Sequence, residues 1–270
     1  MKYKKIFDFT KVPLVLIKRL IFKKKVKSDI RDLIYINYNI CNKEVVSYGI
    51  EFKEFILALK EKPNYLLVIE GNYWGSGFDF NTRCQYSDKA DLNEFIEENV
   101  YSYGDFCWVD FEDEENLNKL KPIEVAELLY LGKLGKPINK PLFEKLSNRF
   151  VYLAHDDGWY NHTYYRNEED YKDIIYGVIN SKIKRLYNFN IDYIGDEILN
   201  KIIRLSEEGC AIDIKKLRID KDNQLSIPIY IIGKHQDMDE VYSLCREKEV
   251  IVNYELIMDD DLWELRRQAK

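Results

Sequence analysis

Residues 148–166, NRFVYLAHDDGWYNHTYYR, decide the fold that we expect for this chain. Two runs rich in aromatic residues, 149–155 and 159–166, stand on either side of an Asp-Asp-Gly turn at 156–158. Runs of this kind around an Asp-Gly pair are the strongest short-range signal for a β-hairpin. An acidic segment with apolar residues at helical spacing begins at residue 167. The stretch therefore predicts a hairpin that leads directly into a helix.

The same hairpin-then-helix order recurs along the chain, at residues 33–60, 65–100, 150–180 and 211–246. Repeated ββα units predict an α+β fold with antiparallel or mixed sheets and helices on one face. We expect three parts: a basic amphipathic arm at 1–30, a main α+β domain at 31–190 and a C-terminal α+β subdomain at 191–270.

Residues 259–268 predict a helix near the C-terminal end of the sequence. Acidic residues stand at its expected start, and Arg266 and Arg267 stand at its expected end. This charge order suits the helix dipole, which favours anions at the N-terminus and cations at the C-terminus.

Composition limits the class of protein. The chain has 270 residues, of which 46% are hydrophobic and 33% charged, as in a globular protein. No apolar run approaches the roughly 20 residues of a membrane-spanning helix, which argues against a channel or a transporter. The N-terminal patch lacks a signal-peptide cleavage site, so we expect a cytoplasmic protein. The five widely spaced cysteines predict reduced, mostly buried thiols.

Charge is unevenly distributed. Residues 1–27 hold ten Lys or Arg and one Asp, a net of +9, so the rest of the chain carries −15 of the total of −6. An acidic body suits a basic protein partner. The arm could contact an anionic membrane surface or a nucleic acid, or it could pack its apolar side on the domain. The cationic side chains for such a contact are Lys18, Arg19, Lys23, Lys24 and Lys25.

The turn of the quoted hairpin holds the sharpest candidate site, because two of the three histidines flank it. The candidates for catalysis are His155, Asp157 and His162, and those for metal ligation are His155, Asp156 and His162. A two-residue turn pairs His155 with Tyr160 and places both histidines on one face. A three-residue loop places them on opposite faces. The simpler interpretation is a turn with two hydrogen-bonded histidines.

Carboxylates elsewhere could join a metal at this hairpin, with Glu70 or Asp110 as the nearest candidates in the pattern. Asp110 begins an acidic run with residues 112–115, which predicts either a solvated loop or a weak metal site. No phosphate-binding loop, dinucleotide fingerprint, zinc-protease motif or serine nucleophile elbow is present in the sequence.

Aromatic residues make up 14% of the chain and include 21 tyrosines. A binding platform could form from Tyr73, Trp74, Trp159 and Tyr160, since Tyr and Trp contribute strongly to interfaces. The alternative is that alternating aromatics are the core of an antiparallel sheet.

Three segments carry a family resemblance: FCWVDF at 106–111, EVAELLYLG at 124–132 and NRFVYLAHDDGW at 148–159, followed by YYR at 164–166. They resemble a family of uncharacterised soluble proteins from spore-forming Gram-positive bacteria. The resemblance covers roughly residues 65–180 and implies no activity, cofactor or catalytic residue.

The sequence thus favours a protein-binding module without a cofactor, of an immunity or regulatory type, that neutralises or modulates a partner. The absence of a catalytic motif makes an enzyme the less favoured class. The alternative is a metal-dependent hydrolase that uses a divalent metal at His155, Asp156, Asp157 and His162.

Overall fold

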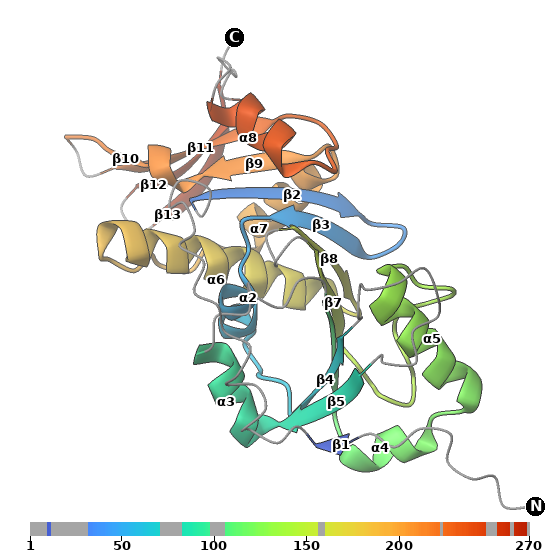
Figure 1. Ribbon diagram of the computed structural model, residues 1–270. Coiled ribbons are helices and arrows are strands. Elements are labelled where there is room, and N and C mark those ends of the chain that lie inside the picture. Colours follow the sequence, from blue (N-terminus) through green and yellow to red (C-terminus); the bar gives the residue numbers. More distant parts are fainter. Residues whose placement is uncertain are drawn as a thin grey trace, which may run out of the picture. The chain divides into compact units, whose positions relative to one another are not determined.

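A computed structural model of the chain describes residues 10–11, 32–70, 83–97, 106–155, 160–221, 224–246, 253–259 and 262–268. These residues divide into two compact units, unit 1 from residues 1–24 and 61–167 and unit 2 from residues 25–60 and 168–270 (Figure 1). Each unit combines helices with a largely antiparallel sheet. The predicted α+β class is confirmed.

The units differ from the domains expected from the sequence, which grouped residues 31–190 together. Strand β2 (Leu33–Asn39) pairs with β9 (Cys210–Asp213), so the first hairpin belongs with the C-terminal part of the chain. Strand pairing between segments this far apart in sequence leaves no local signal, since neither segment is altered by it until the chain folds.

Unit 1 is built on a sheet in the order β1-β5-β4-β6-β7-β8. All of these pairings are antiparallel except that of β1 with β5, which is parallel. The strands are β1 (Thr10–Lys11), β4 (Tyr65–Glu70), β5 (Arg83–Asp88), β6 (Phe106–Phe111), β7 (Phe150–His155) and β8 (Tyr160–Tyr165). The helices are α3 (Lys89–Glu97), α4 (Glu114–Lys119) and α5 (Pro122–Leu134). Residues 144–147, between α5 and β7, form a turn.

Helix α5 covers one face of this sheet (Figure 1). Its Leu128 and Leu131 pack in one cluster with Val109 of β6 and Leu153 of β7. Gly132 permits this close approach, because a Cβ atom there would lie 2.3 Å from Cγ2 of Ile69. The helix begins with Pro122 in its first turn, where the missing N–H of proline costs no hydrogen bond, and ends at Leu134.

Unit 2 has the strand order β3-β2-β9-β11-β12-β13, with the short β10 also paired to β11. Its remaining strands are β3 (Glu44–Tyr48), β10 (Arg218–Ile219), β11 (Leu225–Ile231), β12 (Tyr254–Asp259) and β13 (Leu262–Arg267). Its helices are α2 (Phe52–Ala58), α6 (Glu168–Tyr187), α7 (Asp196–Ser206), the 3-10 turn η3 (Ile214–Lys216) and α8 (Met238–Arg246).

The predicted terminal helix over 259–268 is wrong, because β13 occupies most of this segment. Strand β13 pairs antiparallel with β12 from Asp259↔Leu262 to Tyr254↔Arg267. The charge order that suited a helix is a weak local preference, worth a few tenths of a kcal/mol to about 1 kcal/mol. A full ladder of hydrogen bonds to β12 outweighs it.

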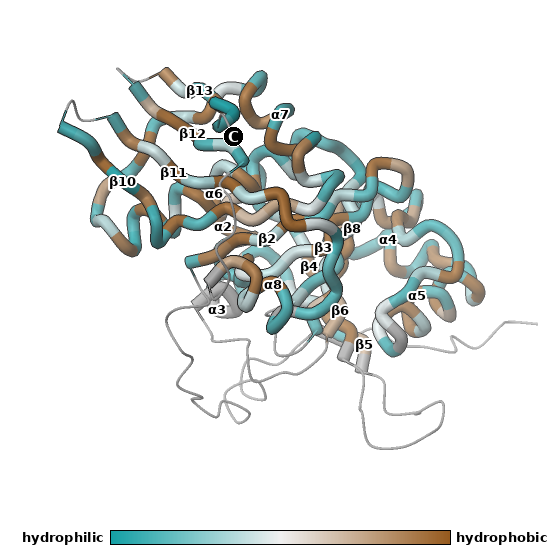
Figure 2. The backbone as a smooth tube through the Cα atoms, turned by 90° about the horizontal axis from the view of Figure 1, so that it is seen from above, coloured by the Kyte–Doolittle hydropathy of each residue, from teal (hydrophilic) through white to brown (hydrophobic). Residues whose placement is uncertain are grey.

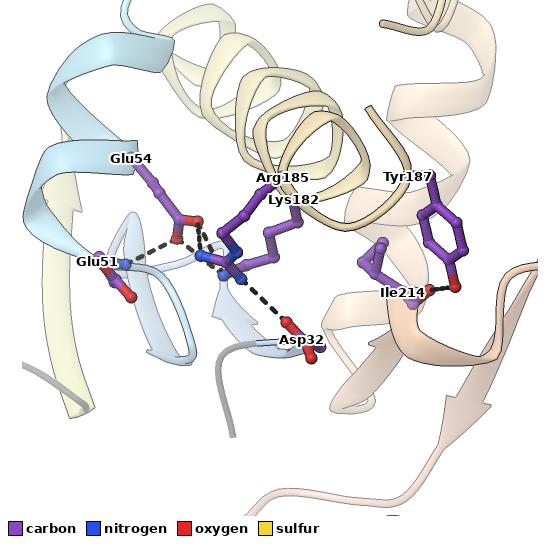
Figure 3. Close-up of polar contacts among 7 residues, drawn as sticks. All are labelled: Asp32, Glu51, Glu54, Lys182, Arg185, Tyr187 and Ile214. Carbon is purple, nitrogen blue, oxygen red and sulfur yellow. Dashed lines mark hydrogen bonds and ion pairs between the residues drawn. The ribbon is translucent and has the colours of Figure 1, made fainter. Parts of the chain in front are cut away.

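A network of charged side chains connects α2, α6 and the start of β2 inside unit 2 (Figure 3). Nζ of Lys182 lies 2.8 Å from Oε2 and 3.1 Å from Oε1 of Glu54. Arg185 donates through Nη1 to Glu54 at 3.3 Å and through Nη2 to Asp32 at 3.0 Å. The side chain of Lys182 is fully buried and that of Glu54 is 6% exposed. The ion pair is therefore enclosed in the protein interior.

The cysteines are free thiols, and four of the five are buried, as predicted. Cys41 is exposed, whereas Cys84, Cys107, Cys210 and Cys245 are buried. In the part of the chain that the structure describes, no helix is both long and apolar enough to cross a membrane.

Candidate site at the end of the β7–β8 hairpin

The strand register places both candidate histidines on one face of the sheet. His155 pairs with Tyr160, and Leu153 pairs with His162. This is the register of the two-residue turn, one of the two arrangements that the sequence left open. Because Leu153 belongs to the core under α5, the face that carries the histidines is the one that α5 covers. The histidines stand where this face reaches the end of the hairpin.

The two imidazoles and the phenol of Tyr160 form one cluster. The ring centroids of His155 and His162 are 5.6 Å apart, and the rings are nearly perpendicular at 84°. The Tyr160 ring lies 4.9 Å from that of His162 and 5.5 Å from that of His155, centroid to centroid. The Tyr160 hydroxyl makes a hydrogen bond with Nε2 of His162. All three side chains are half-buried, so solvent can reach the cluster.

The end of α5 fixes the position of His155. The helix terminates at Gly135, which adopts φ +60° and donates its N–H to the Leu131 carbonyl at 2.9 Å. A Cβ at Gly135 would lie 2.6 Å from Cε1 of His155, so the imidazole packs directly on the glycine backbone. A helix C-terminus carries partial negative charge, which favours a positive charge beside His155. Sequence reasoning did not assign Gly135 to the site, although a glycine after a helical pattern is the usual sign of such a terminus.

Several predicted site residues lie outside the described residues. Asp156, Asp157 and Trp159 belong to the turn that is not described, and so do Tyr73 and Trp74 of the other expected aromatic segment. The same holds for the five cations of the basic arm, Lys18, Arg19, Lys23, Lys24 and Lys25. The described members of the predicted set are therefore His155, Tyr160 and His162, and the structure brings these three together.

Metal ligation needs at least one more donor than these histidines supply. Among the residues that the structure describes, no group of three or more His, Cys, Asp or Glu side chains could hold a metal ion. Asp156 and Asp157, which follow His155 directly in the sequence, are the candidates for a third ligand, and they lie outside the described residues.

Asp110 does not belong to this site. In β6, Val109 pairs with Val151 and Cys107 with Leu153, so Asp110 lies on the opposite face from His155. Its carboxylate accepts the backbone N–H groups of Arg149 and Phe150, both at 2.8 Å, and lies 3.4 Å from Nε of Arg149. Burial raises the pKa of Asp110 to about 6, against the lowering effect of these hydrogen bonds and of the Arg149 charge. The carboxylate thus anchors the start of β7.

The acidic run after Asp110 also has a structural explanation. Asp113 is the N-cap of α4 and accepts the Glu115 N–H at 2.9 Å. Glu114 lies in the first helical turn and accepts a hydrogen bond from the Tyr86 hydroxyl. These carboxylates stabilise a helix N-terminus, as its dipole favours.

Comparison with protein-family models, with curated proteins and with solved structures finds no match to this chain in any of the three. The resemblance of the 106–166 segments to a family from spore-forming bacteria therefore stays a prediction, and the hairpin cluster is the starting point for assigning a function.

Proposed function

We propose that the end of the β7–β8 hairpin binds a divalent transition metal and that the protein uses it to hydrolyse a substrate. The observation that supports this is the placement of His155 and His162 on one face with nearly perpendicular rings 5.6 Å apart. Two imidazoles on one tetrahedral zinc ion have centroids roughly 5–6 Å apart, since each Zn–N bond is about 2.0–2.1 Å. The separation of 5.6 Å between the two ring centroids therefore suits two ligands of one ion.

Each residue of the proposed site would have a separate role in binding the metal or in transferring a proton. His155 and His162 would supply nitrogen ligands, and Asp156 or Asp157 would supply a carboxylate from the turn. The partial negative charge at the C-terminus of α5 would favour the positive charge of the metal ion. A metal held there would supply Lewis-acid activation of a water molecule, which is the chemistry that hydrolysis near neutral pH requires. Tyr160, within hydrogen-bonding reach of His162, is suited to hold or transfer a proton beside the reacting group.

Metal titration of the full chain tests the ligands directly. We expect one Co²⁺ or Zn²⁺ per chain by elemental analysis and calorimetry, and at least tenfold weaker binding in His155→Ala and in His162→Ala, because each loses one ligand. His235→Gln is the matched control, since His235 is the third histidine and contacts Glu240 and the Ile232 carbonyl in unit 2. A metal-free protein, or equal binding by all variants, would rule out the site.

A second candidate function is a protein-binding module of immunity or regulatory type with a basic partner. The observation that favours it is an acidic segment with exposed apolar side chains: residues 61–167 hold 19 acidic and 11 basic residues, a net of −8, whereas residues 1–24 of the same unit carry a net of +7. Ile123 and Ile138 are 63% and 56% exposed. Asn139 donates to Glu127, which ties the loop carrying Ile138 to α5. Exposed apolar groups with a charged rim are typical of interfaces.

Binding to the products of neighbouring genes tests this second function. We expect one basic protein to bind in a 1:1 ratio, with affinity that falls as salt rises because opposite charges attract the pair. The double variant Ile123→Asp with Ile138→Asp should weaken binding at least tenfold, and Leu262→Asp, at an exposed position in unit 2, should not. A complex that is insensitive to salt and to the double variant would contradict the proposal.

A further inference from the structure

Strand β13 forms one end of the strand order in unit 2 and carries a charge pattern that is complementary to itself. One edge of β13 pairs with β12 along all six residues. Among the described residues, no strand pairs with its other edge. Figure 2 shows β13 beyond β12 at the margin of these strands. Leu262 is 75% exposed, and Glu264, Arg266 and Arg267 are exposed as well. An open edge of this kind is a template for another strand.

The direction of the backbone groups follows from one hydrogen bond. The N–H of Gln268 donates to the Asn253 carbonyl at 3.0 Å, which identifies 268 and 253 as a hydrogen-bonded pair of the ladder. Such pairs alternate along an antiparallel ladder, so the even-numbered residues of β13 bond to β12. The N–H and C=O groups of Trp263, Leu265 and Arg267 therefore point to the open edge.

Two copies of β13 can form hydrogen bonds with each other through these backbone N–H and C=O groups. If the strands pair antiparallel about Leu265, the hydrogen-bonded pairs are Leu265 with the partner's Leu265 and Trp263 with the partner's Arg267, twice by symmetry. This gives about six hydrogen bonds. It also places a guanidinium beside an indole, a favourable combination at an interface.

The same register matches the charges. Glu264 stands opposite the partner's Arg266, in a pair that is not hydrogen-bonded and in which side chains lie closest. Within one chain, Nη2 of Arg266 already lies 2.9 Å from Oε2 of Glu264, so both groups occupy the same exposed face. The neighbouring registers that keep the hydrogen bonds are centred on Glu264 or on Arg266, and each places like charges opposite each other, which destabilises pairing.

We propose that the protein forms a two-fold symmetric dimer in which β13 pairs antiparallel with the partner's β13, centred on Leu265. The strand that pairs with the open edge of β13 is the β13 of a second copy of the chain. In this arrangement Glu264 and Arg266 of one copy lie opposite the partner's Arg266 and the partner's Glu264. Six residues a side make a small interface, below the roughly 1,000 Å² of a tight complex, so the dimer is reversible and depends on concentration. The β13 dimer does not depend on the hairpin site in unit 1.

Charge exchange on the full chain tests the dimer. We expect sedimentation equilibrium to show a reversible wild-type dimer, and Glu264→Arg or Arg266→Glu alone to raise the dissociation constant at least tenfold by placing like charges opposite each other. The Glu264→Arg chain then has two cations on this face and the Arg266→Glu chain two anions. A 1:1 mixture of them should restore dimers to near the wild-type affinity.

Two further variants separate strand pairing from other causes. Leu265→Pro removes an N–H that points to the open edge, so it should abolish the dimer while leaving the bonds to β12 and the far-UV circular dichroism unchanged. Lys201→Glu changes the charge of an exposed residue on α7 and should leave the dimer intact. A monomer at all concentrations, a dimer that resists both single charge reversals, or a mixture that fails to recover would overturn the proposal.

Discussion

Replacing Lys182 by methionine is expected to lower the free energy of unfolding by about 3–5 kcal/mol. The substitution keeps the length and apolar stem of the side chain but removes the fully buried cation that bonds both carboxylate oxygens of Glu54. The Glu54 carboxylate would remain buried, with Arg185 as its remaining cationic partner and the Glu51 N–H as a hydrogen-bond donor. An incompletely neutralised charge in the interior is far more costly than the same charge in water.

Urea denaturation followed by circular dichroism measures the fall in the free energy of unfolding. Two further variants serve as controls. Lys201→Met breaks the exposed pair with Glu197 on α7 and should change stability little, because water solvates the carboxylate that remains. The double variant Glu54→Leu with Lys182→Met removes both charges and should recover more than half of the loss. A loss below about 1 kcal/mol in Lys182→Met would contradict the view that the pair is enclosed.

Asp110 is expected to make unit 1 less stable as pH rises through the range from about 4 to about 7. Burial raises the pKa of its carboxyl group from the ordinary value of 3.8 to about 6 in the folded protein. The folded state therefore binds a proton more tightly than the unfolded state between these values. The resulting stabilisation is fully present below the unfolded pKa and is lost as pH rises through the folded pKa.

The comparison of wild type with Asp110→Asn isolates this group, because asparagine does not titrate. The stability of wild type relative to the variant should fall by roughly 2–3 kcal/mol between about pH 4 and pH 7, measured by urea denaturation at each pH. Glu112→Gln removes the same charge from an exposed position and should follow the wild-type profile. A stability of wild type relative to the variant that rises with pH would contradict this expectation. It would mean that the hydrogen bonds from Arg149 and Phe150 stabilise the charged carboxylate by more than its burial destabilises it.

Much of unit 1 follows from local sequence patterns. The hairpin of β7 and β8 was predicted from its turn, and the Asp88 cap of α3 and the proline in the first turn of α5 are local signals of the same kind. Each depends on residues within a few positions of one another, so the physical cause lies in the local chain. The candidate histidines were found for the same reason, since they flank one turn.

The arrangement of those histidines was beyond the sequence, which allowed them to share a face or to lie on opposite faces. The register of Leu153 with His162 decides this, and it is held in part by packing of Leu153 under α5. The contact of His155 with Gly135 likewise depends on where the helix docks, which Gly132 and Ile69 determine.

The sequence by itself determined the α+β class, the reduced state of the mostly buried cysteines and the hairpin that carries the candidate site, because these depend on composition and on near neighbours. Only the tertiary structure decided that residues 262–267 are a strand, that β2 joins β9, and that Lys182 meets Glu54 across 128 positions. The β2–β9 pairing and the Lys182–Glu54 ion pair join distant segments, and β13 pairs with the neighbouring β12. These contacts form only in the folded chain, and their energies exceed the weak local preferences that a sequence displays.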